Sequence, residues 1–213
     1  MSGDASKGTV IRLYRAPWST NVERVTLALG QKGLAAESVW IDYSDRRPVE
    51  QVSGQPFVPL VVFDGEVVPD SPRILRRLEE LYPEPPLYPA DRARRAEMDV
   101  FIEWFNAVWK RPPNEIERIL GLPETDPGQI AELAGQMRSW LDLFEAMLGG
   151  RDYLFGDAFS AADCIAYPFL KYAAGRDPDD DELFHRILDE HQSVDGRPRL
   201  AAWIERIRRL PQP

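Results

Sequence analysis

The sequence predicts a small α/β domain, residues 10–83, followed by an all-helical domain, residues 92–213. Patterns typical of strands and of helices alternate in the first part of the chain, whereas only helical patterns occur in the second part. Between them, residues 83–91 contain four prolines, which cannot continue a helix or a central strand. We therefore expect residues 84–91 to link two domains.

Two strands and the helix between them begin the α/β domain. The stretch TVIRLYRA, residues 9–16, is rich in strand-forming side chains, and ESVWIDY, residues 37–43, repeats this pattern. Between them, Thr20 and Glu23 fit the capping box T-x-x-E, and Gly33 supplies a helix end. A strand, a helix and a strand within about 35 residues form a βαβ unit, so the two strands should be parallel.

A β-hairpin and a second helix complete the α/β domain. The third strand is VPLVVF, residues 58–63, and Asp64–Gly65 is a two-residue sequence that favours a tight hairpin. The fourth strand is EVV, residues 66–68, and the helical stretch DSPRILRRLEELY follows, with Ser71 as its expected N-cap. The order predicts a small mixed sheet flanked by helices.

Amphipathic helices make up the second half. Residues 92–110 form one helical stretch rich in aromatic side chains, and the prolines of PPNE, residues 112–115, are expected to break it. Residues 127–148 place their apolar side chains on one helical stripe. Two further helical patterns follow, in FSAADCIAYPFLKYA and in RPRLAAWIERIRRL.

Cysteine and histidine usage excludes two kinds of site. Cys164 is the only cysteine, so neither an internal disulfide nor a CxxC redox pair can form. It follows Ser160 and Asp163, which fit a capping box, and we expect Cys164 to be buried and inert. His185 and His191 stand six residues apart, which does not place them on one helical face, so we expect no metal.

Charge and hydropathy exclude two classes of partner. The net charge is -9 and the isoelectric point about 4.9, which argues against binding nucleic acid or an anionic membrane surface. No apolar run reaches the roughly 18 residues that a membrane-spanning helix needs. Residues 1–9 are polar and lack the apolar centre of a signal peptide, so we expect a flexible leader on a cytoplasmic protein.

Three stretches, taken in order, resemble the glutathione transferase superfamily. They are STNVERV at residues 19–25, GQPFVPLVVFDGEVVPDSPRIL at residues 54–75 and FSAADCIAYPFL at residues 159–170. The resemblance implies a thioredoxin-like domain that binds glutathione, an all-helical C-terminal domain and a homodimer. The pattern Ser-x-Asn-x-x-Arg is similar to the serine-type classes phi, theta and zeta. The implied activity is conjugation of the glutathione thiolate to a small hydrophobic electrophile, without a metal.

Ser19 is the expected catalytic residue. It stands at the turn into the first helix, where unpaired backbone N–H groups favour an anion. A thiol with an ordinary pKa near ~8.5 is mostly protonated at neutral pH, so a hydroxyl that donates to the sulfur would favour the nucleophilic thiolate. Two alternatives stay open. Ser19 could be only a helix cap, although Thr20 with Glu23 fits the cap better, and Tyr14 is a rival donor.

The resemblance also implies the residues that bind glutathione. In the family the proline of Val58–Pro59 is cis, and the backbone of Val58 pairs with the cysteinyl part of glutathione like an added strand. From the residues alone, an ordinary trans proline at the edge of the sheet would be the default. Ser71 and the helix N-terminus suit the γ-glutamyl carboxylate, and Asp70 suits the α-amino group by charge. Arg47 is a further expected contact.

Phe57 departs from the family pattern. Relatives commonly carry a polar Gln or Lys at this position, and that side chain contacts glutathione, which phenylalanine cannot do by hydrogen bonding. Gln55, Arg46 and Arg47 are the candidates to compensate for the missing contact.

Aromatic residues are expected to line the electrophile pocket between the two halves. The candidates are Trp18, Phe101, Trp104 and Phe105. The last three also have the helical spacing of ordinary core residues, so a core role is the alternative.

Two other functions stay open. A zeta-type isomerase also uses glutathione, on unsaturated diacids, but the Ser-Ser-Cys run typical of that class is replaced here by Ser19-Thr20-Asn21. A non-catalytic binding or dimerisation protein with the same fold is the other alternative, and Phe57 is the feature that favours it.

Overall fold

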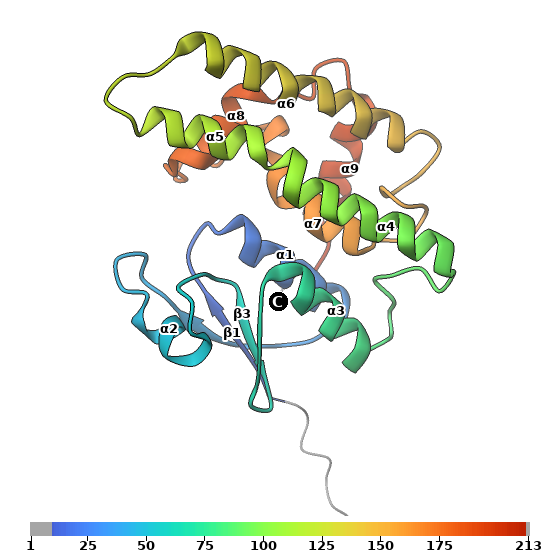
Figure 1. The fold of residues 1–213 in the computed structure, drawn as a ribbon. Helices are drawn as coiled ribbons and strands as arrows, with labels where there is room; N and C mark the ends of the chain where they lie inside the picture. The colour runs from blue at the N-terminus through green and yellow to red at the C-terminus, as the bar shows by residue number, and fades with distance from the viewer. Residues whose placement is uncertain (1–9, 212–213) are drawn as a thin grey trace, which may run out of the picture. The chain divides into compact units, whose positions relative to one another are not determined.

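The computed structural model describes residues 10–211, and the contacts among them form two compact units. Unit 1 runs up to Pro83, and unit 2 runs from Glu84 to Pro211 (Figure 1). The leader expected at residues 1–9 lies outside the described residues. Each unit buries its own set of apolar side chains.

Unit 1 contains a four-stranded sheet in the order β2-β1-β3-β4. β1 and β2 are parallel, whereas β3 is antiparallel to both β1 and β4. The order βαβ followed by ββα is therefore confirmed, with one short helix, α2, that the sequence patterns missed. The elements of unit 1 are β1 (Ile11–Arg15), α1 (Thr20–Gln31), β2 (Glu37–Trp40), α2 (Arg47–Ser53), β3 (Leu60–Phe63), β4 (Glu66–Pro69) and α3 (Ser71–Leu81).

Helices cover both faces of this sheet, because successive side chains of a strand point to opposite faces. Tyr14 and Leu60 stand opposite each other on β1 and β3, and both are buried in a cluster with Val49 of α2. Leu13 and Val61, one position along, point to the other face and are 1% exposed. The buried stripes of α1 and α3, which pack against each other, fill this second face.

A buried ion pair joins the C-terminal ends of α1 and α3. The Nζ atom of Lys32 lies 2.8 Å from Glu79 Oε2 and 2.6 Å from the carbonyl oxygen of Tyr82. The Lys32 side chain is fully buried, and that of Glu79 is 11% exposed. Charges this deeply buried are tolerated only when they are paired, and this pair links α1 to α3.

Unit 2 is helical, and its described residues add only one isolated β-bridge, between Tyr153 and Gly156. Its elements are α4 (Arg92–Trp104), the π-helical turn η1 (Phe105–Trp109), α5 (Arg111–Leu120), α6 (Pro127–Met147), α7 (Ala161–Leu170), the 3₁₀ turn η2 (Lys171–Ala174), α8 (Leu183–His191) and α9 (Pro198–Arg208).

The helical stretch expected at residues 92–110 ends at Lys110, just before the prolines, but residues 112–115 lie in a further helix that the sequence patterns missed. This helix is α5, and it begins at Arg111, directly after the turn at Lys110. Pro112 and Pro113 lie in the first turn of α5, where the missing N–H groups would have had no intrahelical partner in any case. The two prolines therefore start a helix here.

The segment expected to be a linker packs into unit 2. Leu87 and Tyr88 are 1% and 4% exposed, although they stand among prolines. The backbone N–H of Ala161, at the start of α7, donates to the carbonyl of Leu87 over 2.8 Å. The prolines end the secondary structure, but the apolar residues between them are anchored.

The capping box at the start of α7 is confirmed. Asp163 Oδ2 accepts hydrogen bonds from both the N–H and the hydroxyl of Ser160, and Oδ1 accepts from Leu154 N–H and Trp203 Nε1–H. Asp163 is fully buried, and this burial raises the pKa of its carboxyl, while the four donors oppose the rise. Cys164, next to it, is buried as expected.

Candidate functional site

The strand register brings the sequence-predicted residues of unit 1 to one edge of the sheet. Tyr14 pairs with Leu60, and Leu60 pairs with Pro69, so the end of β1, the start of β3 and the end of β4 are level with one another. Because β2 is parallel to β1, the segment after β2 emerges at the same edge. The residues that follow or precede these strand ends are Ser19, Tyr43, Arg46, Val58, Pro59, Asp70 and Ser71.

Ser19 is the N-cap of α1, which corrects the expectation that Thr20 caps this helix. Ser19 has extended backbone angles, φ -70° and ψ 110°, and its Oγ atom accepts a hydrogen bond from the N–H of Val22 over 3.3 Å. Thr20 is already the first helical residue. Two neighbouring hydroxyl residues are equally able to cap, so only the backbone angles decide which one does.

Capping does not use up the Ser19 hydroxyl. A hydroxyl oxygen has two acceptor lone pairs and one O–H donor, and the cap occupies only an acceptor. The hydroxyl proton can therefore point toward an anion bound at the N-terminus of α1. The roles of cap and thiolate donor, expected to be alternatives, are compatible.

Two residues with left-handed backbone angles stand directly before the two serines. Trp18 has φ 58° and precedes Ser19, and Asp70 has φ 72° and precedes Ser71. A bulky residue in this region costs of order 1–3 kcal/mol, and such strain is concentrated at functional sites. Trp18 is also 43% exposed, so its indole is available at this edge of the sheet.

The peptide bond between Val58 and Pro59 is cis, as the resemblance implied. Just before it, the side-chain amide of Gln55 binds the backbone of Phe57 at both ends: Phe57 N–H donates to Oε1 over 2.7 Å, and Nε2 donates to the Phe57 carbonyl over 3.0 Å. Gln55 is thus occupied in holding the chain and is a poor substitute for the missing polar contact. The Phe57 ring is 72% exposed.

The expectation that Ser71 is the N-cap of α3 is wrong. Asp70 is the N-cap, and Ser71 is the first helical residue. The Asp70 side chain does not accept a hydrogen bond from the backbone N–H groups of the first turn of α3. Ser71 is 2% exposed, and its Oγ atom accepts a hydrogen bond from Nη1 of Arg24 over 3.3 Å. Because Arg24 donates to the Ser71 oxygen, the hydroxyl proton of Ser71 points away from Arg24.

Arg24 is a functional candidate that the sequence reasoning missed. It is 1% exposed, it comes from the same helix as Ser19, and it places a guanidinium beside the N-terminus of α3. Its only sequence signal was its place as the arginine of the pattern Ser-x-Asn-x-x-Arg, which was used to choose a class and not to assign a role.

Arg46 and Arg47 have different surroundings, although they are adjacent. Arg47 forms a two-pronged pair with Asp45, with Nε–Oδ1 and Nη2–Oδ2 distances of 2.8 and 2.7 Å, and these bonds lower the pKa of Asp45 to about 2. The guanidinium of Arg46 lies 4.3 Å over the ring of Tyr43, whose hydroxyl donates to the carbonyl of Pro17. Arg46 is therefore the arginine connected to the loop before Ser19.

The other aromatic candidates are mostly core residues. Tyr14 is 8% exposed and packs among apolar side chains, which disfavours it as the thiol donor. Phe101 and Phe105 are 7% and 0% exposed and contact each other within the aromatic core of unit 2. Trp104 is half-buried, with its ring against Phe101. The electrophile pocket between the two halves stays a prediction.

Neither a metal site nor a membrane-spanning helix is found within residues 10–211. No group of three or more histidine, cysteine, aspartate or glutamate side chains is arranged to hold a metal ion. In the same part of the chain, every helix is too short or too polar to span a bilayer. The sheet edge offers hydroxyl groups, guanidinium groups and helix N-termini, which favour an anion, together with the carboxylate of Asp70, which favours a cation.

Comparison with known proteins matches both units. The family model described as "Glutathione S-transferase, N-terminal domain" matches residues 13–86, and "Glutathione S-transferase, C-terminal domain" matches residues 127–206. Glutathione S-transferase F10 of Arabidopsis thaliana is 26% identical over 93% of this chain and 92% of its own length. Maleylacetoacetate isomerase of Pseudomonas aeruginosa is 31% identical over 78% of this chain and 82% of its own length.

A solved structure has the same fold along nearly the whole chain. The tau class glutathione S-transferase of mango, Mangifera indica, superposes with a TM-score of 0.78 at 16% identity, covering 95% of this chain and 90% of that chain. At this identity the likeness concerns the fold, a thioredoxin-like domain followed by a helical one.

Proposed function

Because the chain belongs to the glutathione S-transferase superfamily, we propose that it binds glutathione at the sheet edge of unit 1 and transfers its thiolate to a small hydrophobic electrophile. One observation carries the proposal. The strand register gathers Ser19, the cis Val58–Pro59 bond and the buried Arg24–Ser71 pair at one edge, where α1 and α3 both begin. Two helix N-termini and a guanidinium at one edge suit a ligand with several negative charges.

The thiol is activated by Ser19 in this proposal. The Ser19 hydroxyl donates a hydrogen bond to the thiolate sulfur, while its oxygen continues to accept from the N–H of Val22. The positive end of α1 adds to the effect, because it favours an anion within its first turn. Both contributions stabilise the thiolate relative to the thiol, so the pKa of the bound thiol falls toward neutral pH.

The remaining parts of glutathione have partners of matching chemistry. The γ-glutamyl carboxylate accepts from the Ser71 hydroxyl at the N-terminus of α3, with Arg24 behind it as a buried positive charge. Asp70 faces the α-amino group, and the backbone of Val58 pairs with the cysteinyl part. The glycyl carboxylate is bound by Arg46 in place of the expected Arg47, since Asp45 already neutralises Arg47.

The reaction is a nucleophilic transfer. The thiolate sulfur forms a bond to an electrophilic carbon, and a leaving group departs as an anion or, in an addition, the neighbouring atom takes up a proton. Trp18, exposed beside Ser19, offers an aromatic surface to an apolar electrophile. The protein acts as a cytoplasmic homodimer in this proposal, as the resemblance implied.

Two other functions each have one observation in their favour. The name of the Pseudomonas relative supports a glutathione-dependent isomerase, whereas the replacement of Ser-Ser-Cys by Ser19-Thr20-Asn21 opposes it. The exposed Phe57 supports a non-catalytic binding protein, because it removes one polar contact to glutathione.

Calorimetric titration with glutathione, followed by a turnover assay with an activated aryl halide and with a cis-unsaturated diacid, separates the three functions. We expect binding and aryl transfer. Binding with diacid isomerisation and no aryl transfer would select the isomerase. Absence of binding would leave the non-catalytic function. S-methylglutathione, which cannot form a thiolate, is the matched ligand for measuring how much the thiolate contributes to binding.

A further inference from the structure

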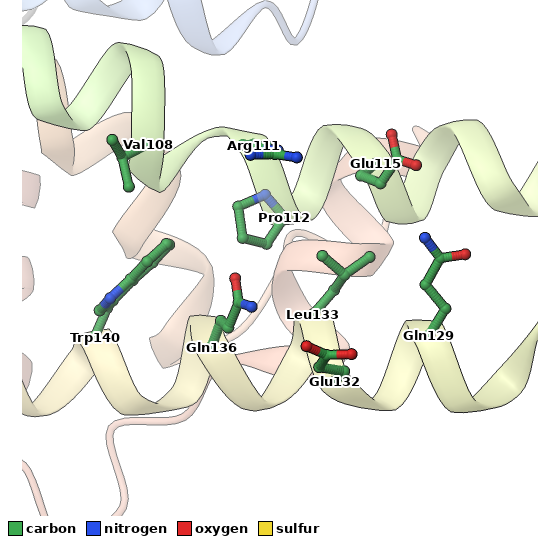
Figure 2. A pocket seen from close by; sticks show the side chains of 9 residues that line it. All are labelled: Val108, Arg111, Pro112, Glu115, Gln129, Glu132, Leu133, Gln136 and Trp140. Carbon is green, nitrogen blue, oxygen red and sulfur yellow. The ribbon is translucent and has the colours of Figure 1, made fainter.

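A groove lies between α5 and α6 of unit 2, and none of the residues assigned to glutathione lines it. Its volume is about 400 Å³, within the range of small-molecule sites. The side chains that line it come from η1, α5 and α6 and are shown in Figure 2: Val108, Arg111, Pro112, Glu115, Gln129, Glu132, Leu133, Gln136 and Trp140.

One end of the groove is apolar. Figure 2 shows the indole of Trp140 reaching from α6 toward Val108, which is 41% exposed. Trp104 packs edge-on against Trp140, with ring centroids 5.8 Å apart and planes at 74°, and so supports the indole. Val108 belongs to the π-helical turn η1, a feature that is frequent at functional sites. A half-buried indole beside aliphatic walls suits a planar ring.

The rest of the groove is lined by polar side chains with unused hydrogen-bonding groups. Within residues 10–211, the side chains of Arg111, Gln129, Glu132 and Gln136 make no hydrogen bond or ion pair with another residue. Glu115 differs, because Arg118 holds its carboxylate at 2.6 Å. The groove therefore offers a guanidinium fork, two amides and one carboxylate, which together donate and accept.

The charge balance selects a neutral ligand. Arg111 and Glu132 contribute one charge of each sign, and the second carboxylate, that of Glu115, is paired with Arg118, so the groove is close to neutral. A phosphate group would therefore gain no net attraction here. A neutral heteroaromatic ring with both donors and acceptors on its edge matches these groups, because arginine pairs with adjacent carbonyl and ring-nitrogen acceptors and a carboxylate accepts from ring N–H and amino groups.

We propose that the groove between α5 and α6 binds a neutral purine base or nucleoside of the guanine type. The fused ring lies against Trp140, the Arg111 fork donates to the carbonyl oxygen and the adjacent ring nitrogen, and Glu132 accepts from the N–H groups on the opposite edge. Gln136 and Gln129 bind the remaining polar atoms. Stacking on an aromatic side chain and edge hydrogen bonds together are the usual means of recognising a base.

Calorimetric titration of the full chain with guanosine tests the proposal, with guanosine monophosphate and adenosine as comparison ligands. We expect guanosine to bind with a dissociation constant below about 1 mM, more tightly than either comparison ligand. Arg111→Ala should weaken binding about tenfold or more, the usual cost of losing a two-pronged arginine contact. Arg138→Ala, on the exposed surface of α6 outside the groove, is the matched control and should change nothing.

Three results would overturn the proposal. They are no guanosine binding by the unmodified protein, equal binding by the Arg111→Ala protein, and tighter binding of the monophosphate than of guanosine. Gln136→Ala gives a second variant on the other helix and should also weaken binding. Glutathione binding by all these variants should stay unchanged, which keeps this site separate from the one on unit 1.

Discussion

Ser19 carries two roles that two substitutions can separate. Ser19→Ala removes both the cap on α1 and the hydroxyl donor, whereas Ser19→Gly removes the donor and leaves a residue that caps nearly as well. Losing the Val22 N–H contact should cost about 0.5–2 kcal/mol of stability in the alanine variant and only a few tenths in the glycine variant. Ser19→Thr keeps a hydroxyl and serves as the control.

The effect on the bound thiol should be the same in both variants. A hydrogen bond to a charged group contributes about 1.5–3 kcal/mol, which corresponds to about 1–2 units in the pKa of the thiol. The pKa of bound glutathione should therefore rise by about that amount in Ser19→Ala and Ser19→Gly alike, and turnover near neutral pH should fall.

The assay is a pH titration of thiolate absorbance in the protein–glutathione complex, beside thermal unfolding of each variant. An unchanged thiol pKa in the Ser19→Gly protein would refute the reasoning and would leave Ser19 only as a cap. In that case Tyr14→Phe would identify the other candidate donor.

Three further predictions concern Ser71, the two arginines that follow β2, and the buried ion pair between α1 and α3. Ser71→Ala should weaken glutathione binding by about 1.5–3 kcal/mol with the fold intact by circular dichroism; an unchanged dissociation constant would remove Ser71 from the site. Arg46→Ala should weaken glutathione binding, whereas Arg47→Ala, its paired neighbour, should not, and calorimetry giving the opposite order would restore the expectation from the sequence. Lys32→Met should lower the free energy of unfolding by about 3–5 kcal/mol, because it removes one member of a buried ion pair; denaturant unfolding that shows less than 1 kcal/mol, about the value of an exposed pair, would contradict the pairing.

The order of elements could be predicted because local chemistry determines it. Asp64–Gly65 forms the turn between β3 and β4, and the prolines after residue 83 end the α/β domain, as their backbone restrictions require. The short helix α2 was missed because seven residues are too few to show a helical period. The helix α5 was missed because Pro112 and Pro113 were taken only as the end of one helix, whereas a proline in the first turn also starts a helix well.

The sequence predicts which types of side chain form the site, but it does not always distinguish between two neighbouring residues of the same type. Ser19 and Thr20 are both good caps, and only their backbone angles distinguish them. Arg46 and Arg47 are chemically identical, and the difference between them arises from Asp45, which binds one of them. Arg24 and Ser71 are 47 positions apart, so their contact depends on the packing of α1 against α3, which no local pattern encodes.

The most direct test of the central claim is whether the Ser19 side chain faces the glutathione sulfur. In a Ser19→Cys protein, the introduced thiolate at the N-terminus of α1 should attack oxidised glutathione, form a mixed disulfide and release one glutathione thiolate. Intact-mass spectrometry should then show the addition of one glutathione. Two proteins should remain unmodified: the unmodified chain, whose only cysteine, Cys164, is buried, and the Thr20→Cys variant, at a position that is 6% exposed. Failure of the Ser19→Cys protein to gain this mass, in a chain shown to bind glutathione, or equal modification of Thr20→Cys, would contradict the account.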